Sequence, residues 1–195
     1  CDDGTYRPLG ADIDAKSCDV DLSFKDQRRY KERLRSAQKA TGRDEALVGG
    51  EAHLEGRPLV LLLWLGDFME ASVGAVVLER LALAVKTARE GSAALVSVGA
   101  PGKLRLQEKA AAMGALAQLA SLRRELEASK VPTLAISSVA GGPLFDVFAA
   151  DITLVSPRGE GLLEGGVCGA VVGRSELRVR LAQLLRIFAP RGTRR

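Results

Sequence analysis

The stretch from Ala93 to Glu108, AALVSVGAPGKLRLQE, constrains the fold of this 195-residue chain more than any other. Residues 93–98 are a short apolar run with β-branched valines, which is typical of a buried strand and too short for a buried helix. Gly99, Pro101 and Gly102 end this run. Beyond them, leucine and alanine recur three and four residues apart, which is the spacing of a helical face. The sequence therefore predicts a strand, a glycine turn and a helix in that order.

The glycine turn has two chemical interpretations. A strand that passes into a helix through glycines directs unpaired backbone N–H groups into a small volume at the helix N-terminus, which suits a carbonyl oxygen or an anion. In an enzyme, such a volume can be an oxyanion hole. The alternative is that the glycines only turn the chain, because strand-to-helix turns are common in α/β proteins.

The rest of the chain repeats the strand-plus-helix pattern. The strand expected at 131–139 is followed by Ala140-Gly141-Gly142-Pro143, a second glycine turn. Because ligands of such sheets gather at the carboxyl ends of the strands, the two glycine turns are expected to face one pocket. The expected elements are strands at 46–54, 58–65, 93–98, 131–139 and 152–155, and helices at 25–39, 73–89, 106–128, 144–150 and 176–187.

Composition narrows the function classes. Hydrophobic residues make up 47% of the chain, enough for the core of one domain, while aromatic residues make up only 4%, which disfavours a surface that stacks on nucleic-acid bases. The longest apolar run, Leu59 to Leu65, is far shorter than the roughly 20 residues that a membrane-spanning helix needs. We therefore expect neither a membrane nor a nucleic acid as partner.

Cysteine and histidine usage argues against a metal centre. Cys1, Cys18 and Cys168 lie too far apart for a C-x-x-C motif, and His53, the only histidine, is expected on the surface of a strand. A sparse, odd cysteine count favours a reducing compartment, so we expect a cytoplasmic location. A cysteine in place of an initial methionine indicates a cut or processed chain, with a lipid-anchored Cys1 as the alternative.

Basic residues crowd the segment 25–43, although the net charge of the chain is only +4. This segment could bind the phosphates of a nucleotide-bearing ligand or of nucleic acid. The alternative is a solvated helix face, because Asp26 and Glu32 are interleaved with the basic residues. We expect residues 1–23 to form an irregular, loosely packed arm, 24–189 the domain, and 190–195 a basic tail.

Several motifs in a fixed order resemble one protein family. They are the run SFKDQRRYKERLRSAQKATGRDEALVGGEAHLEGRPLV, then DFMEASVGAVV, then LRLQE, and then AGG followed by FAADITLVSP. From about Ser23 to the last expected helix, the chain resembles the carboxyltransferase β subunit of bacterial acetyl-CoA carboxylase. The resemblance implies an α/β fold of the crotonase type, built from ββα units. It also implies transfer of a carboxyl group from carboxybiotin to acetyl-CoA, which gives malonyl-CoA.

The resemblance further implies site residues and partners. The enolate of the thioester would be held by backbone N–H groups at Gly102, Lys103, Gly141 and Gly142. The phosphates of CoA would be bound by Arg29, Arg33 and Arg105. Biotin would arrive on a carrier protein, with an α-type subunit as partner in a homo- or hetero-oligomer. This chain itself would bind no metal and no cofactor.

The chain departs from the family at the positions that matter most for catalysis. The family motif Ser-Gly-Gly-Ala-Arg corresponds to residues 101–105 here, and Lys103 replaces its second glycine. The family motif Phe-Met-Gly-Gly-Ser corresponds to residues 68–72, and Glu70 and Ala71 replace its two glycines. The segment 159–169 also replaces a longer helical excursion that reaches the family's partner subunit. One hypothesis is therefore a working carboxyltransferase or a related acyl-CoA enzyme such as a decarboxylase. The other is a non-catalytic paralogue that binds acyl-CoA or other proteins.

Two further expectations concern activity and assembly. A carboxylate at Glu70 would face the enolate and oppose its formation by repulsion, so we expect little or no malonyl-CoA. The helices at 73–89 and 106–128 are rich in alanine and leucine, so we expect them to present an apolar patch for self-association or for an α-like partner.

Overall fold

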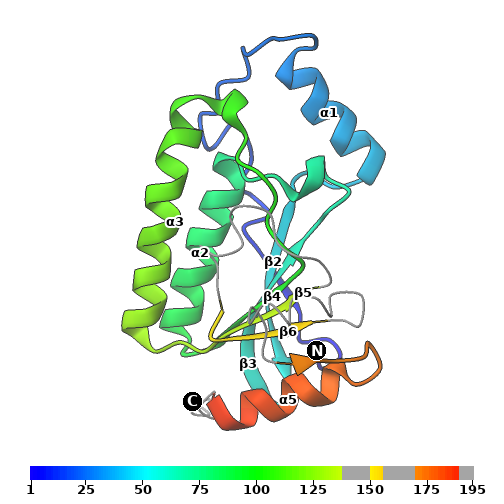
Figure 1. Cartoon of the computed structure of the whole chain (residues 1–195), viewed down its shortest axis with the longest axis vertical. Coiled ribbons are helices and arrows are strands. Elements are labelled where there is room, and N and C mark those ends of the chain that lie inside the picture. The colour runs from blue at the N-terminus through cyan, green and yellow to red at the C-terminus, as the bar shows by residue number, and fades with distance from the viewer. Residues whose placement is uncertain (138–149, 156–169, 189–195) are drawn as a thin grey trace.

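A mixed sheet of seven strands forms the centre of the protein. The computed structural model describes residues 1–137, 150–155 and 170–188, and within them the strands lie side by side in chain order (Figure 1). The strands are β1 (Arg7–Leu9), β2 (Leu47–Leu54), β3 (Arg57–Trp64), β4 (Ala94–Val98), β5 (Thr133–Ser137), β6 (Ile152–Val155) and β7 (Ala170–Val171). The pairs β1–β2 and β2–β3 are antiparallel, and every later pair is parallel.

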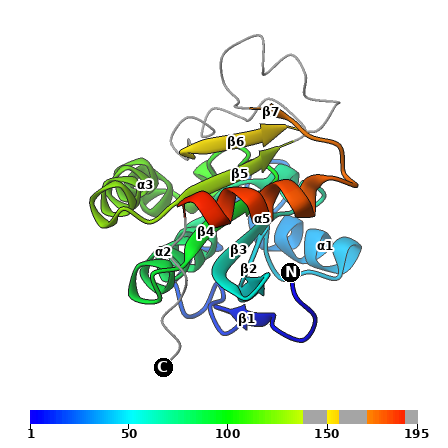
Figure 2. The same cartoon turned by 90° about the horizontal axis from the view of Figure 1, so that it is seen from below.

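Helices cover both faces of this sheet. Within the described residues the α-helices are α1 (Tyr30–Thr41), α2 (Ala75–Glu90), α3 (Ala110–Ser129) and α5 (Leu177–Phe188), and two short 3-10 helices lie at Met69–Ala71 and Leu106–Glu108. The helices α2 and α3 lie next to each other and pack on one face, whereas α5 packs on the other face, at the end where β2 turns into β3 (Figures 1 and 2). The expected strand–strand–helix order is confirmed in β2, β3 and α2.

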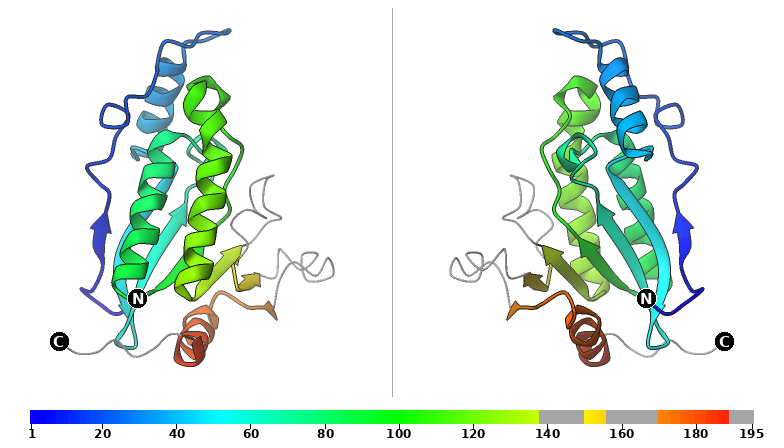
Figure 3. Two further views of the ribbon diagram at one scale, coloured as in Figure 1. Left: turned by 90° about the vertical axis from the view of Figure 1, so that its left-hand side faces the viewer. Right: turned by 90° about the vertical axis from the view of Figure 1, so that its right-hand side faces the viewer.

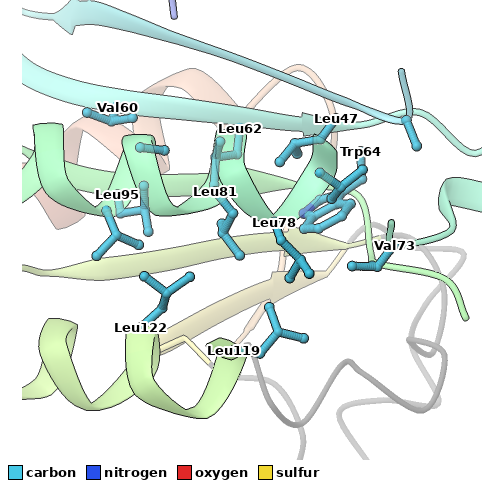
Figure 4. Close-up of a cluster of buried hydrophobic side chains, with 14 of the residues drawn as sticks. Leu47, Val60, Leu62, Trp64, Val73, Leu78, Leu81, Leu95, Leu119 and Leu122 are labelled. Atoms are coloured by element: carbon cyan, nitrogen blue, oxygen red, sulfur yellow. The ribbon is translucent and has the colours of Figure 1, made fainter. Parts of the chain in front are cut away.

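The core confirms the prediction that β3 is buried on both faces. Val60 and Leu62 point toward α2, while Leu59 packs on the α5 side, and all three side chains are at most 2% exposed. Figure 4 shows Leu81 of α2 among the side chains of β3 and Leu95 of β4. Full burial of a leucine or valine side chain stabilises a fold by about 1.5–3 kcal/mol. The run 58–65, in which apolar and polar residues do not alternate, therefore forms a strand in the interior of the sheet.

The N-terminal arm is attached more firmly than we expected. β1 pairs with the outer edge of β2, and the Tyr6 hydroxyl donates to the Gly49 carbonyl over 3.0 Å. A Cβ at Gly50 would overlap the Tyr6 ring, so the glycine makes room for this contact. The prediction of loose packing was wrong for this part of the arm because the edge of β2 has backbone groups that need partners. Residues 11–23 contain neither helix nor strand, as expected for an irregular arm.

Helix α1 ends as the sequence predicted. Gly42 adopts the left-handed conformation, with φ of 64°, and donates its N–H to the Gln38 carbonyl. Only Tyr30 and Leu34 of this helix are buried, and α1 stands at one end of the molecule, shown at the top in Figures 1 and 3. The expected helix at 144–150 and the tail at 190–195 lie largely or wholly outside the described residues.

Candidate functional site

The glycine turn after β4 runs alongside the turn that follows β3. The Gly102 N–H donates to the Ala71 carbonyl, Val73 N–H donates to Lys103, and Arg105 N–H donates to Val73, each over 2.8 Å. This pairing keeps the segment extended, and α3 begins only at Ala110. The helix expected at 106–128 is thus confirmed with a later start: Leu106–Glu108 form a 3-10 turn, and the α-helix begins four residues after the expected position. The cause is that the backbone groups of this segment pair with the neighbouring turn instead of starting a helix.

Gly102 is required by the close approach of two backbones. A Cβ built at this position would overlap the Glu70 carbonyl oxygen and lie 3.1 Å from the carbonyl carbon of Ala71. Because the Gly102 N–H is donated to the Ala71 carbonyl, it is committed within the chain. Gly141 and Gly142 lie outside the described residues, so a pocket shared by the two glycine turns stays a prediction.

The turn after β3 has an unusual backbone. Met69, Glu70 and Ala71 all have positive φ, at 47°, 57° and 53°. Residues with a Cβ are disfavoured there by roughly 1–2 kcal/mol each, whereas glycine is not. Two of these positions are those where the resembled family has glycine, so the chain keeps a glycine-type backbone without the glycines. The Glu70 side chain is exposed, and its effect on an enolate stays a prediction.

Arg105, which we expected to bind CoA, is buried and paired within the protein. Its side chain is 2% exposed. Its guanidinium donates to both carboxylate oxygens of Glu45, with the Nη1–Oε2 distance at 2.8 Å, and its Nε donates to Ser72 Oγ over 2.9 Å. The same group lies 5.6 Å from the centre of the Phe68 ring. In this structure the donors of Arg105 are directed at Glu45 and Ser72 inside the protein, which argues against a role in CoA binding, and that role stays a prediction.

A second carboxylate, Glu108, completes this buried group of polar side chains, which we call the Arg105 cluster: Tyr30, Glu45, Ser72, Arg105 and Glu108. Glu108 accepts hydrogen bonds from the Tyr30 hydroxyl and from the Ala75 N–H, the latter over 2.7 Å. Ala75 is the first residue of α2, where the helix dipole favours a negative charge. The anion site at this helix N-terminus is thus filled by the protein's own carboxylate.

The Arg105 cluster shifts the ionisation of its members. Burial raises the pKa of the Tyr30 phenol above its ordinary value, and the nearby Glu108 adds to this. Burial opposes the charge of Arg105, but the paired Glu45 outweighs it and raises the pKa of the guanidinium. Sequence reasoning missed Glu45 as a partner because it lies 60 residues from Arg105. In the sequence, only the spacing of three residues between Arg105 and Glu108 indicated that these two side chains could pair.

The other two arginines expected to bind CoA lie at the start of α1. Arg29 is exposed and immediately precedes the helix, and Arg33 forms an ion pair with Asp26. Surface pairs of this kind contribute little stability, about 0–1 kcal/mol. Both arginines are therefore accessible to an anion, and their role in binding CoA stays a prediction.

A cavity of about 250 Å³ lies on the helix side of the sheet, among β3, β4, α2 and α3. Its walls are mostly apolar, with Leu62, Leu95 and Leu122 among them, and Glu127 and Lys130 belong to its polar lining. None of residues 99–108 lines it. The cavity is therefore separate from the glycine turn.

The sequence also led to expectations about the cysteines, a metal centre and a membrane-spanning helix, and the described part of the chain bears on them. There, Cys1 and Cys18 are free, His53 is exposed on β2, and no group of histidine, cysteine and carboxylate side chains could hold a metal ion. Cys168 lies outside the described residues. Among the helices of the described part, none has the length and apolar character needed to span a bilayer.

The apolar patch that we expected on α2 and α3 is not seen on α2. Its large apolar side chains are buried, except for the partly buried Leu83, and the exposed ones of the described chain lie elsewhere, at Tyr6, Leu106, Val179, Ile187 and Phe188. Three of these five belong to α5. The reason is that α2 packs against both the sheet and α3, so its apolar surface is covered within the chain.

No protein-family model matches the sequence. Among solved structures, the Pseudomonas malonate decarboxylase MdcD-MdcE hetero-dimer is similar, with a TM-score of 0.70 and 18% identity over 97% of this chain and 83% of that chain. Transcarboxylase 12S, a hexamer, gives a TM-score of 0.69 at 14% identity over 94% of this chain and 39% of that one. A single-chain, multi-domain long-chain acyl-CoA carboxylase gives a TM-score of 0.66 at 19% identity, over 99% of this chain and 22% of that one.

These likenesses confirm the fold. The chain has the crotonase-like α/β architecture that the sequence predicted. At identities below 20%, they establish the architecture and leave the reaction to be argued from the site.

Proposed function

We propose that this chain is a carboxyltransferase-type subunit that has lost carboxyl transfer at its glycine turn and acts through contacts with partner proteins. The observation that supports this most strongly is the hydrogen bond from the Gly102 N–H to the Ala71 carbonyl. An oxyanion hole needs free donors held 2.7–3.1 Å from the developing charge, and loss of one donor typically slows the reaction about 100- to 1,000-fold.

Releasing the Gly102 N–H for a ligand would be unfavourable. The Ala71 carbonyl would lose its donor, at a cost of about 1–3 kcal/mol for a buried acceptor. The neighbouring pairing of Val73 with Lys103 and Arg105 holds the two turns in the same register. An acyl-CoA enolate would therefore have to displace a network that already satisfies itself.

The partners are proposed from the resemblance and from the kind of assembly seen in the similar structures. Those structures include a hetero-dimer, a hetero-tetramer and a hexamer. We propose a cytoplasmic acyl-CoA carboxylase or decarboxylase assembly as the setting, and the acetyl-CoA carboxylase β subunit as the relative. An α-type subunit and a biotin carrier protein are then the partners to test. Any CoA binding would be weak and salt-sensitive, with its phosphates at Arg29 and Arg33.

A reconstitution assay tests this function. The purified chain is mixed with acetyl-CoA, a carboxylated biotin carrier protein and an α-type carboxyltransferase subunit, and malonyl-CoA is quantified by mass spectrometry. We expect no malonyl-CoA above the control without the chain, together with co-sedimentation of the chain and the α-type subunit. A rate comparable to that of an ordinary acetyl-CoA carboxylase would refute the proposal and favour a working carboxyltransferase. Activity gained by the double variant Glu70→Gly, Lys103→Gly would show that the replaced glycines at these two positions contribute to the loss.

A further inference from the structure

Charge is divided unevenly along the first part of the chain. Residues 25–43 contain eight basic and two acidic side chains, a net charge of +6, while the whole chain carries +4. Residues 1–23 contain six acidic and two basic side chains, a net charge of −4. Two neighbouring segments therefore have strong and opposite charge.

The positive charge is concentrated on the outer side of α1. Lys31, Arg35 and Lys39 are four residues apart, so they form one stripe along the helix. At 100° per residue this stripe is turned away from the buried Tyr30 and Leu34. All three side chains are exposed, and within the described residues none of the three forms an ion pair. Glu32 is the only acidic residue of α1 and lies three residues before Arg35, so this side of the helix keeps a net positive charge.

The negative charge lies on the neighbouring side of the same end. Asp12, Asp14 and Asp19 of the arm are exposed, and Glu79 of α2 is exposed and lines one shallow groove together with Asp19. We call these four residues the acidic surface. Figures 1 and 3 show this part of the arm and α1 at the same end of the molecule. The stripe and the acidic surface thus belong to elements at the same end of the molecule.

We propose that this end joins two copies of the chain, with the stripe of each copy against the acidic surface of the other. A two-fold axis between the copies would form both contacts at once. The two surfaces cannot satisfy each other within one chain, because Tyr30 and Leu34 fix α1 with its stripe pointing outward. This inference does not depend on the proposed function.

A nucleic acid fits this end less well than a second copy does. The acidic surface beside the stripe would repel a phosphate backbone. The aromatic residue of α1, Tyr30, is buried and cannot stack on a base. None of the exposed large apolar side chains of the described residues lies on α1. The contact is therefore polar, and its strength should depend on salt.

Salt dependence is the first test. Sedimentation equilibrium of the full chain is measured in 50 mM and in 500 mM sodium chloride. We expect a monomer–dimer equilibrium whose dissociation constant rises at least about tenfold at the higher salt. A monomer at every concentration in low salt, or a dimer that is insensitive to salt, would overturn the proposal.

A charge exchange between two variants is the sharper test. The variant Lys31→Glu, Arg35→Glu makes both surfaces acidic, and Asp12→Lys, Asp19→Lys, Glu79→Lys makes both basic, because only Asp14 of the acidic surface is then left negative. Each variant alone should associate at least on the order of 30-fold more weakly than the parent, since four or more charges per dimer become repulsive. An equimolar mixture should form a dimer again, because each surface then meets its opposite in the other variant.

Controls separate this effect from misfolding and from overall charge. Circular dichroism and thermal melting should be those of the parent for every variant. The matched variant Lys86→Glu, Arg124→Glu, at exposed sites on α2 and α3, changes the net charge by the same amount as Lys31→Glu, Arg35→Glu, and it should dimerise like the parent. A mixture that stays monomeric would overturn the proposal, as would a control that dissociates equally or a nucleic-acid probe that binds the parent in place of a second copy.

Discussion

The substitution Gly102→Ala tests whether the glycine is present for close backbone approach. The added methyl group would overlap the Glu70 carbonyl oxygen, which belongs to the backbone and cannot rotate away. Overpacking of this kind typically costs about 1–3 kcal/mol. Separation of the two turns would also weaken three backbone hydrogen bonds of 2.8 Å, worth roughly 1 kcal/mol each. We expect a loss of about 2–4 kcal/mol in the free energy of unfolding.

Urea unfolding followed by circular dichroism measures this loss. The midpoint should fall while the slope with denaturant stays unchanged, as expected for a change in stability alone. The matched control is Gly114→Ala in α3, where a new Cβ meets no atom within 4 Å. There we expect a gain of about 0.5–1 kcal/mol, because alanine favours a helix over glycine. A loss below about 0.5 kcal/mol for Gly102→Ala would refute the close approach of the two turns.

Three further predictions concern the turn after β3 and the Arg105 cluster. Glu70→Gly should be about 1 kcal/mol more stable than Glu70→Ala in urea, because only glycine relieves the positive φ. Arg105→Gln should lose about 3–5 kcal/mol in the same assay by leaving Glu45 buried without its cation, and the double variant with Glu45→Gln should recover part of it. Because burial raises the pKa of Tyr30, stability should fall as the pH rises above about 10, where only the unfolded phenol ionises. Unfolding measured from pH 8 to 11 should show a smaller fall for Tyr30→Phe.

The sequence predicted most of the fold because its signals are local. The run 58–65 has no polar residue that could face water, so it had to be a central strand, and β3 is one. The end of α1 at Gly42 could be predicted because glycine readily adopts the left-handed conformation that ends a helix. By contrast, β1 could not be predicted from three residues, since its pairing depends on the free edge of β2.

The site was harder to predict because its contacts join distant segments. Gly102 looks the same in the sequence whether its N–H faces a ligand or the Ala71 carbonyl. Arg105 resembles a phosphate-binding arginine until Glu45 and Ser72 are placed beside it by the fold. The glycines after residue 98 predicted a turn that follows β4, but the sequence could not show where the hydrogen bonds of this turn go.

Observation of the Gly102 amide tests the central claim most directly. Pro101-Gly102 is the only Pro-Gly pair in the chain, so labelling proline with ¹³C at the carbonyl and glycine with ¹⁵N gives this amide a unique NMR signal. If the N–H is donated to Ala71, it should exchange slowly with solvent, and its position should not change when acetyl-CoA is added to millimolar concentration. Rapid exchange together with a saturable shift on addition of acetyl-CoA would contradict the account, because the N–H would then be free to bind the thioester.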